Sequence, residues 1–230
     1  MKNRKIFLIA ILAMLGSPAI AQTTDAEGVS FGVRAGFNFQ NINGKDNDDD
    51  NLELKMVPRF NAGLVADIPV APEFYFQPGL LFTTKGAKTE ETLNSTLEYN
   101  ISYLELPLSF LYKPVLGSGY MLLGFGPYVA YGIDGKVKIE SPLGDEEMDI
   151  EFTDETTNVI DVLDIPYSNA FRRLDFGANL FFGYQLQNGF SVQLNTQLGL
   201  AKINADNTLD DNDEMTFRNT GFGISLGYMF

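Results

Sequence analysis

Cysteine and histidine are both absent from this sequence of 230 residues. Without cysteine the chain has no disulfide bond and no thiolate nucleophile. Without histidine it has no Ser-His or Cys-His catalytic pair and no histidine-ligated metal site. These absences exclude the commonest forms of nucleophilic catalysis and leave carboxylates as the candidates for acid-base chemistry.

Basic residues are also few. The chain has 16 lysines and arginines against 30 carboxylates, so its net charge is −14. Binding to a phosphate backbone requires clustered lysine and arginine side chains. Nucleic acid is therefore excluded as a partner.

Long apolar runs are missing after the N-terminus. The first one, Ile6–Leu15, follows a basic start and precedes a small-residue site ending at Ala21. It is about half as long as a spanning helix, which needs ~20 apolar residues. This order predicts a signal peptide over residues 1–21, cleaved after Ala21. We expect residues 22–230 to form one domain, and cleavage removes three basic and no acidic residues, giving a net charge of −17.

The last ten residues, GFGISLGYMF, alternate strictly between two kinds of side chain. Even positions are large and apolar, whereas odd positions are mostly glycine or serine. A period of two is typical of a strand with one apolar face. About eight segments show this pattern, each near the ~10 residues of a membrane-spanning strand. The other seven are 29–39, 60–68, 74–85, 103–113, 120–131, 173–185 and 190–200.

The connections between these segments alternate in length. Three are short (70–73, 114–119 and 187–189), and four are long (40–55, 86–98, 132–171 and 201–215). Short periplasmic turns and long outer loops are typical of an outer-membrane barrel. Closure also removes strand edges, which lipid does not tolerate. The sequence thus predicts an all-β fold, an eight-stranded antiparallel transmembrane β-barrel with up-and-down topology.

A soluble sandwich or lipocalin-like barrel is the alternative, because its strands also alternate. Those folds keep the apolar face inside and the polar face in water. Here the second face is rich in glycine, asparagine, glutamine and single charges, which suits neither a solvated exterior nor a hydrocarbon core. Aromatic residues gather at segment ends, such as Phe37 with Phe39 and Tyr228 with Phe230. This placement is typical of interfacial girdles and favours the membrane barrel.

Several segments together resemble the PorT-like outer-membrane β-barrel family of bacteria. They are GVRAGFN, FYFQPGLLFTTKG, YLELPLSFLYK, LGFGPYVAYG and RLDFGANLFFGYQL, followed by a last strand that ends in phenylalanine. The resemblance covers nearly the whole mature chain. It implies a location in the bacterial outer membrane and a small eight-stranded barrel. A few members of that family are accessory parts of a protein-secretion system, and most have no assigned function.

The C-terminal segment is also similar to the signal read by the barrel-assembly machinery. This similarity implies a targeting role for Ile224, Leu226, Tyr228 and Phe230. The alternative is that these side chains only contact lipid, and both roles are compatible.

Charged residues occur on the face that we expect to line the lumen. The interior of an eight-stranded barrel is just wide enough for side chains to fill it. Buried charges must pair, because each would otherwise cost several kcal/mol. Glu105 and Asp175 are also a candidate acid-base pair. A structural ion network explains the same residues. We therefore predict no catalytic residue and no cofactor. The predicted lumen network comprises Arg34, Arg59, Asp67, Lys85, Glu105, Lys113, Arg173 and Asp175.

Acidic residues are concentrated in the long connections, which hold 24 of the 30 carboxylates. The first loop begins like a calcium-binding EF-hand loop, but Asn51 and Val57 replace its glycine and its closing glutamate. A solvated acidic surface is therefore the alternative to calcium binding. In the longest loop, 136–140 and 148–152 predict a hairpin above the membrane. The calcium candidates are Asp46, Asp48, Asp50, Asp210, Asp211 and Asp213.

The sequence as a whole predicts a monomeric, non-enzymatic barrel with a structural or surface-interaction role. Its expected partners are outer-membrane lipids, the barrel-assembly machinery, and an envelope or secretion protein reached through the long loops. An accessory component of a secretion or transport assembly is the second hypothesis. A lipid-modifying enzyme is the third.

Overall fold

The computed structural model describes residues 28–45, 51, 54–89, 95–142, 144–156, 160–162, 165–167, 169–208 and 214–230. No helix within these ranges is long and apolar enough to cross a membrane. The predicted signal peptide and all six calcium candidates lie outside the described residues.

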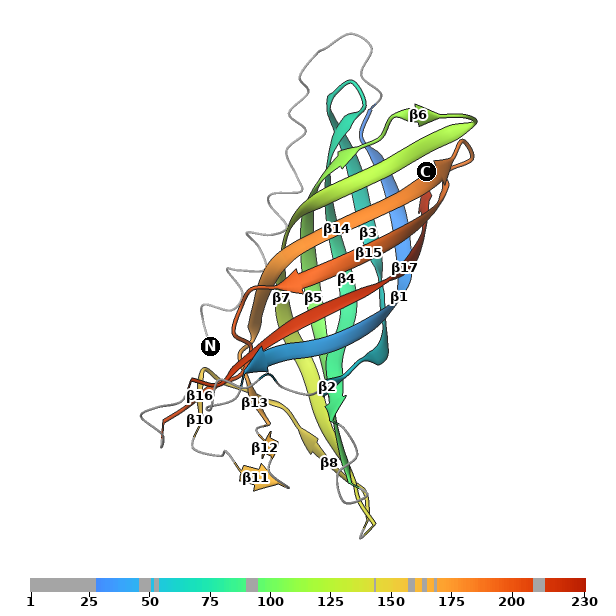
Figure 1. Ribbon diagram of the computed structural model, residues 1–230. Coiled ribbons are helices and arrows are strands. Elements are labelled where there is room, and N and C mark those ends of the chain that lie inside the picture. Colours follow the sequence, from blue (N-terminus) through green and yellow to red (C-terminus); the bar gives the residue numbers. More distant parts are fainter. Residues whose placement is uncertain are drawn as a thin grey trace.

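Eight long strands form a closed barrel (Figure 1). Each pairs antiparallel with the next long strand in the chain, and β1 pairs with β17 to close the circle. The predicted up-and-down topology is confirmed. The strands are β1 (Ser30–Lys45), β3 (Val57–Ala71), β4 (Phe74–Thr89), β5 (Thr96–Tyr112), β7 (Gly119–Glu140), β14 (Leu174–Leu186), β15 (Phe190–Gly199) and β17 (Thr216–Met229).

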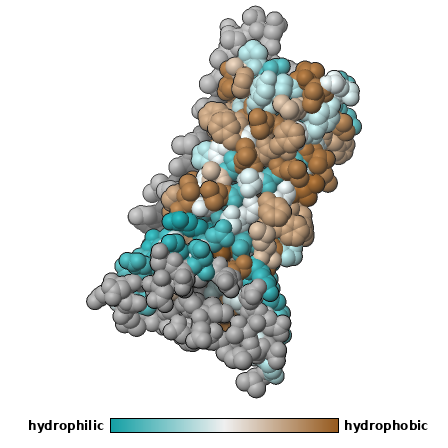
Figure 2. Space-filling view, in the orientation of Figure 1, coloured by the Kyte–Doolittle hydropathy of each residue, from teal (hydrophilic) through white to brown (hydrophobic). Residues whose placement is uncertain are grey.

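The two faces of the wall follow the predicted alternation. On β17 the side chains of Phe222, Ile224 and Leu226 point outward and are about half exposed, whereas Ser225 points inward and is buried. Successive side chains of a strand lie on opposite faces, so assigning one residue to a face assigns every other residue of that strand. Figure 2 shows the result as a surface with many apolar side chains over the strands and hydrophilic ones toward the loops.

The short connections all lie at one end of the barrel, here called the turn end, which is at the top of Figure 1. Between β5 and β7 the short strand β6 (Val115–Leu116) folds back on β7. The β14–β15 turn contains Gly189, whose φ of 91° favours glycine. A Cβ atom there would lie 2.3 Å from the carbonyl oxygen of Met229.

At the opposite end, the loop end, the strands continue further than predicted. The predicted loop 86–98 is mostly strand, because β4 extends to Thr89 and β5 begins at Thr96. Strand β7 pairs with β8 (Glu146–Asp149), so the predicted hairpin forms, but its second arm is 146–149 rather than 148–152. Strand β2 (Leu54–Lys55) pairs with β4. The strands continue because the alternation persists beyond the apolar band, with Leu97 and Tyr99 still buried inside.

The longest loop and the last loop meet over the loop end. Their buried side chains Ile150, Phe171 and Ile203 pack with Tyr99 and Phe217 of the barrel. These five residues are called the apolar cap. The loops carry β9 (Glu151–Phe152) paired with β13 (Ala170–Phe171), β10 (Glu155–Thr156) paired with β16 (Asp206–Asn207), and β11 (Ile160–Val162) paired with β12 (Ile165–Tyr167).

Candidate functional site

One group of charges lies inside the barrel, next to the apolar cap on its turn-end side. The ammonium of Lys85 lies 2.9 Å from Glu105 Oε2 and 3.0 Å from Asp175 Oδ2. All three side chains are buried. Two carboxylates therefore share one cation, and these three residues are called the Lys85 cluster.

Neutral side chains add hydrogen bonds to this cluster. Tyr128 donates its hydroxyl to Asp175, and Asn219 donates to Asp175 Oδ2 over 3.0 Å. Gln197 donates to Glu105 Oε1 over 2.9 Å. The Lys85 ammonium also lies 4.1 Å from the centroid of the Tyr128 ring. Such partners are what makes buried charge tolerable in a low-dielectric interior.

A second group of charges lies nearer the turn end. Lys113 forms a salt bridge of 3.1 Å with Asp67, which also accepts a 2.6 Å hydrogen bond from Gln77. Arg34 donates to Gln77 Oε1 over 2.5 Å and lies 5.2 Å from the Phe181 ring. With the Lys85 cluster, the lumen contains three cations and three carboxylates among these residues.

Arg59 is placed differently from the prediction. Its guanidinium pairs with Glu98 at 2.9 Å and donates to the backbone oxygen of Tyr99, with no contact to the lumen charges. The β3–β4 ladder ends at Asn61 and Thr83, before it reaches Arg59. The ladder of β3 with β1 continues through Arg59 and Asn38, so the strand register holds here and only the partner of the guanidinium differs from the prediction.

Arg173 also lies apart from the lumen network. Its guanidinium stacks on the rings of Tyr131 and Phe152, at 5.4 and 4.7 Å, and donates to the Gly132 oxygen. Strand β14 begins one residue later, at Leu174. The alternation used for the prediction does not extend to a residue outside the strand.

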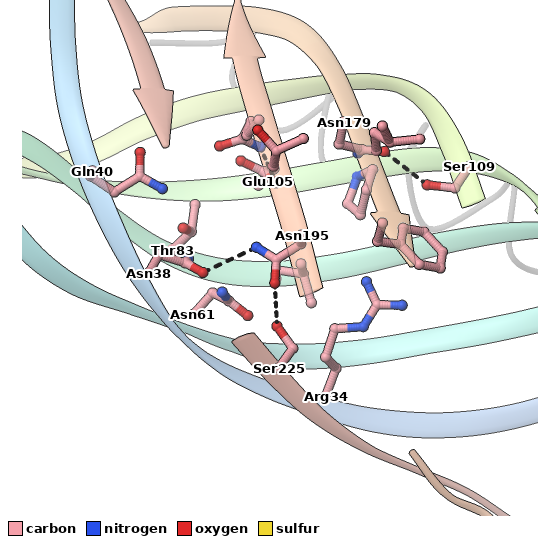
Figure 3. A pocket seen from close by; sticks show the side chains of 16 residues that line it. Arg34, Asn38, Gln40, Asn61, Thr83, Glu105, Ser109, Asn179, Asn195 and Ser225 are labelled. Atoms are coloured by element: carbon pink, nitrogen blue, oxygen red, sulfur yellow. Dashed lines mark hydrogen bonds between the residues drawn. The ribbon is translucent and has the colours of Figure 1, made fainter. Parts of the chain in front are cut away.

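A cavity of about 50 Å³ separates the two charge groups (Figure 3). Its wall is mainly polar and includes Asn38, Asn61, Ser109, Asn179, Asn195 and Ser225. Asn195 donates to Asn38 over 3.1 Å and accepts from Ser225 over 3.0 Å. Sites for small organic ligands usually have volumes of about 300–1,000 Å³. The cavity is therefore too small for a lipid or sugar substrate.

Ion pairs hold the two large loops together at the edge of the cap. Asp206 Oδ2 lies 2.5 Å from Arg172, and its Oδ1 lies 2.8 Å from Lys202. The hydrogen bond from Lys202 and the nearby charge of Arg172 lower the pKa of Asp206 below its usual range. Because Arg172 and Asp206 belong to different loops, this carboxylate joins them.

Replacing Asp206 with asparagine is expected to loosen the cap without unfolding the barrel. The groups are partly exposed, so each lost pair is worth about 0.2–1 kcal/mol. Arg172 and Lys202 should then be cut faster by trypsin in the folded protein. Glu146→Gln, at an exposed position of β8, is the control and should leave the cutting rate unchanged. Equal cutting rates in the wild type and Asp206→Asn would contradict this role.

The same ion pairs predict a pH dependence. A lowered folded pKa means that the stabilisation is complete above the ordinary aspartate pKa of about 3.9 and is lost as the pH falls through the folded value. We therefore expect hydrogen exchange at the Ile203 amide to be constant, after correction for intrinsic rates, between pH 5 and 7. Below about pH 4 it should rise, and less so in Asp206→Asn.

The lumen is expected to be closed to ions. The side chains of the Lys85 cluster are buried inside it, and large rings such as Tyr103 and Tyr128 are fully buried with the apolar cap in one cluster. Barrels with an open aqueous channel have about 16–18 strands. The purified protein in a planar bilayer should show no steady conductance above background. A reproducible, ion-selective current from the unmodified protein would contradict this prediction.

No group of three or more acidic residues in the described ranges is placed to hold a metal ion. The proposed calcium ligands lie outside those ranges. Calcium binding stays a prediction.

The proposed assembly signal forms the last strand and its end. The Tyr228 ring lies 4.8 Å from Phe190 and 5.4 Å from Phe230, measured between centroids. Ile224 and Leu226 are exposed on the outer face. The position suits lipid contact, and the targeting role stays a prediction.

Sequence reasoning missed the apolar cap and the polar cavity. Phe171 and Ile203 lie in loops with no strand-like alternation, and acidic residues surround them in the sequence. The inward asparagines and glutamines were visible as a polar face, but their convergence on one cavity depends on the closed barrel. The aromatic and aliphatic residues within the loops were the available signal for the cap.

Comparison with solved structures finds small outer-membrane barrels at low identity. Ail of Yersinia pestis, solved with the heparin analogue sucrose octasulfate, is 12% identical over 89% of this chain and 100% of its own, with a TM-score of 0.40. Neisserial surface protein A is 10% identical over 89% of this chain and 100% of its own, with a TM-score of 0.43. OprG from Pseudomonas aeruginosa is 14% identical over 89% of this chain and 97% of its own, with a TM-score of 0.44.

Comparison with curated proteins finds no match. A family model described as an outer membrane protein beta-barrel domain matches residues 20–228, almost the whole chain. The closed antiparallel meander with an apolar outer face is the architecture that this description names. The chain belongs to this family and is a small β-barrel protein of the bacterial outer membrane.

Proposed function

We propose that this protein is a closed, non-enzymatic barrel whose extracellular cap binds a partner at the cell surface. Outer-membrane barrels have short turns in the periplasm and longer loops outside, so the loop end is extracellular. The observation that carries the proposal is the folded cap. Loops that only connected strands would need neither a buried apolar cluster nor the Asp206 ion pairs.

The charge of the cap defines the chemistry of the partner. Glu146, Asp149, Glu151 and Glu155 are exposed on the described part of the longest loop. Complementary potentials steer association and are weakened by salt. We therefore propose a cationic partner, such as an envelope protein with a basic surface, and binding that weakens as ionic strength rises.

The lumen supports a structural role for the buried carboxylates. Glu105 and Asp175 bind the same ammonium and accept further hydrogen bonds from neutral side chains. A general acid-base pair needs room for a substrate between its groups. Here that space holds Lys85, which favours an ion network over catalysis.

Crosslinking in intact membranes tests the proposal. The unmodified protein should capture a partner. A triple variant with Glu146→Lys, Glu151→Lys and Glu155→Lys, called the cap variant, should reduce the yield of the crosslinked complex. Glu73→Lys, an exposed carboxylate at the turn end, is the matched control and should capture as the wild type does. Equal yields from the cap variant and the wild type would contradict binding through the cap.

An accessory role in a secretion assembly is the second candidate, in line with the resemblance to PorT-like proteins. The observation that favours it is at the periplasmic turns, where Val70, Val115 and Leu116 are 60%, 69% and 54% exposed. Exposed apolar side chains outside the hydrocarbon band suit contact with another protein. Under this hypothesis, Val115→Asp with Leu116→Asp should abolish a crosslink to a periplasmic protein, and the cap variant should not.

A further inference from the structure

Arg173 takes no part in the lumen network, and its guanidinium lies where β14 begins at the loop end. We propose that this guanidinium binds a phosphate group of an outer-leaflet lipid and that the contact holds the longest loop on the barrel. Three features support the site: unpaired donors, a position at the edge of the apolar wall, and contact with a ring of the cap.

The charge of Arg173 has no carboxylate partner among the described residues. The neighbouring Arg172 is paired with Asp206, but none of the ion pairs in the described ranges includes Arg173. One of its nitrogen atoms, Nη1, donates to the backbone oxygen of Gly132 over 3.2 Å. In the described part of the chain Nε and Nη2 have no hydrogen bond, and neither atom is buried. The positive charge therefore has accessible donors to offer to an external anion.

The two free nitrogen atoms form one edge of the planar guanidinium. Their N–H groups point the same way and match two oxygen atoms of a phosphate. The guanidinium carbon lies 5.4 Å from the Tyr131 ring and 4.7 Å from the Phe152 ring. These rings and the bond to Gly132 already restrict the side chain, so less freedom is lost when an anion binds. The arrangement is a preorganised anion site.

The site lies where the apolar wall meets the loop end. Tyr131 pairs with Leu174, the residue after Arg173, and both side chains are exposed on the outer face, at 44% and 56%. The next outward pair toward the turn end, Val129 and Phe176, is also apolar and exposed. Tyrosine is typical of the boundary between membrane and water. The guanidinium is thus at the level of lipid headgroups.

A lipid phosphate fits this level better than a dissolved anion. The loop end is extracellular, so the lipid beside it belongs to the outer leaflet. The net charge of −14 keeps dissolved anions away from the protein. A lipid phosphate is held at the boundary by its own acyl chains, beside the apolar side chains of the wall. Its effective concentration at the site is therefore high.

Phe152 connects the site to the cap. It belongs to β9 in the longest loop and packs against the apolar cap. Its ring covers Gly132, where an added Cβ would lie 2.4 Å from the ring. The next residue, Thr153, donates its amide to the backbone oxygen of Phe171 over 3.0 Å. A phosphate bound to Arg173 fixes the guanidinium on which Phe152 stacks, so it should stabilise the closed form of the loop.

Hydrogen exchange at the Thr153 amide tests the proposal, with the protein folded into phosphatidylcholine vesicles. Vesicles that also contain lipid A, a phosphorylated outer-leaflet glycolipid, should slow the exchange several-fold relative to vesicles with dephosphorylated lipid A. In Arg173→Gln the two kinds of vesicle should give equal rates. Equal rates in the wild type, or an unchanged difference in Arg173→Gln, would overturn the proposal.

The matched control is Arg218→Gln, which removes an exposed arginine of β17, two strands away from β14. This variant loses the same charge but keeps the contact between Arg173 and Phe152. It should show the wild-type difference between the two kinds of vesicle. Loss of the difference in Arg218→Gln would mean that total charge, and not the Arg173 site, is responsible.

The source of the anion is tested with inorganic phosphate. In phosphatidylcholine vesicles, millimolar phosphate should leave exchange at Thr153 unchanged relative to chloride at equal ionic strength. If phosphate slowed the exchange as much as lipid A does, the assignment to a lipid would be wrong.

Binding itself is measured by mass spectrometry of the folded protein in mild detergent with added lipid A. The wild type should retain the lipid, and Arg173→Gln should retain several-fold less. Arg173→Lys should not restore retention, because an ammonium lacks the edge with two parallel donors. Wild-type retention by either variant would contradict the site. The folded fraction is isolated by its gel mobility without heating, and no measurement involves a protein partner, so this proposal and binding at the cap fail separately.

Discussion

Replacing Lys85 with methionine is expected to lower the free energy of unfolding by about 3–5 kcal/mol. Lys85 is the one cation within salt-bridge distance of both Glu105 and Asp175 in the described ranges. Methionine keeps most of the length of the side chain, so the change mainly removes its charge. Two buried carboxylates then lack a counter-ion. Urea titration in lipid vesicles, followed by the shift in gel mobility on unfolding, measures the loss.

The matched control is Lys136→Met, which removes an exposed lysine paired with Glu147 on the outer hairpin. Exposed pairs contribute about 0–1 kcal/mol, so this variant should unfold almost as the wild type does. If Lys85→Met were equally mild, the Lys85 cluster would contribute nothing to stability.

Neutralising the whole cluster should recover much of the loss. In Lys85→Met combined with Glu105→Gln and Asp175→Asn, no unpaired charge is left buried. Replacing all members of a buried ion group is often neutral or stabilising, unlike removal of one member. The triple variant should therefore be more stable than Lys85→Met alone, and a further decrease would contradict an electrostatic origin.

The wall of the barrel could be predicted because alternation in a strand depends only on local geometry. Once the apolar side of 103–113 is assigned to lipid, Glu105 and Ser109 must point inward, and both are buried. The same reasoning placed Lys85 and Asp175 correctly. It required no knowledge of which strands are neighbours.

The pairing of these charges could not be predicted in the same way. Lys85 and Asp175 are 90 positions apart in the chain, and they meet because they face each other across the closed lumen. The height of each inward residue depends on the stagger between strands, which the alternation leaves open. Arg59 shows the limit of the method, because alternation assigns its face of the strand but not its partner, which is Glu98 rather than a lumen charge.

The cap depends on contacts between loops. Phe171 and Ile203 have no periodic neighbours, and they become core residues only when two distant loops pack on Tyr99 and Phe217. Composition alone indicated that these loops are acidic. The apolar residues within the loops were visible in the sequence, but their packing on Tyr99 and Phe217 depends on how the loops fold.

Replacing Leu180 with arginine is expected to lower the free energy of unfolding by about 2–4 kcal/mol. Leu180 lies at the centre of β14, between Phe125 of β7 and Thr196 of β15, and is 48% exposed on the outer face. In water an exposed leucine tolerates arginine easily. In the hydrocarbon core of a bilayer the guanidinium loses its hydration, so the expected penalty reports on the surroundings of this face. The same urea titration in vesicles measures it.

The control uses the same substitution on the same strand. Leu186 is also exposed, at 45%, but it ends β14 at the turn end of the barrel. Arginine near the interface costs only about 0–1 kcal/mol, because its head group reaches water. Leu186→Arg should therefore be mild, and the difference between the two positions measures depth in the membrane. If Leu180→Arg were as mild as Leu186→Arg in lipid, the outer face would not lie in hydrocarbon. In detergent that admits water to the barrel surface, the two penalties should converge.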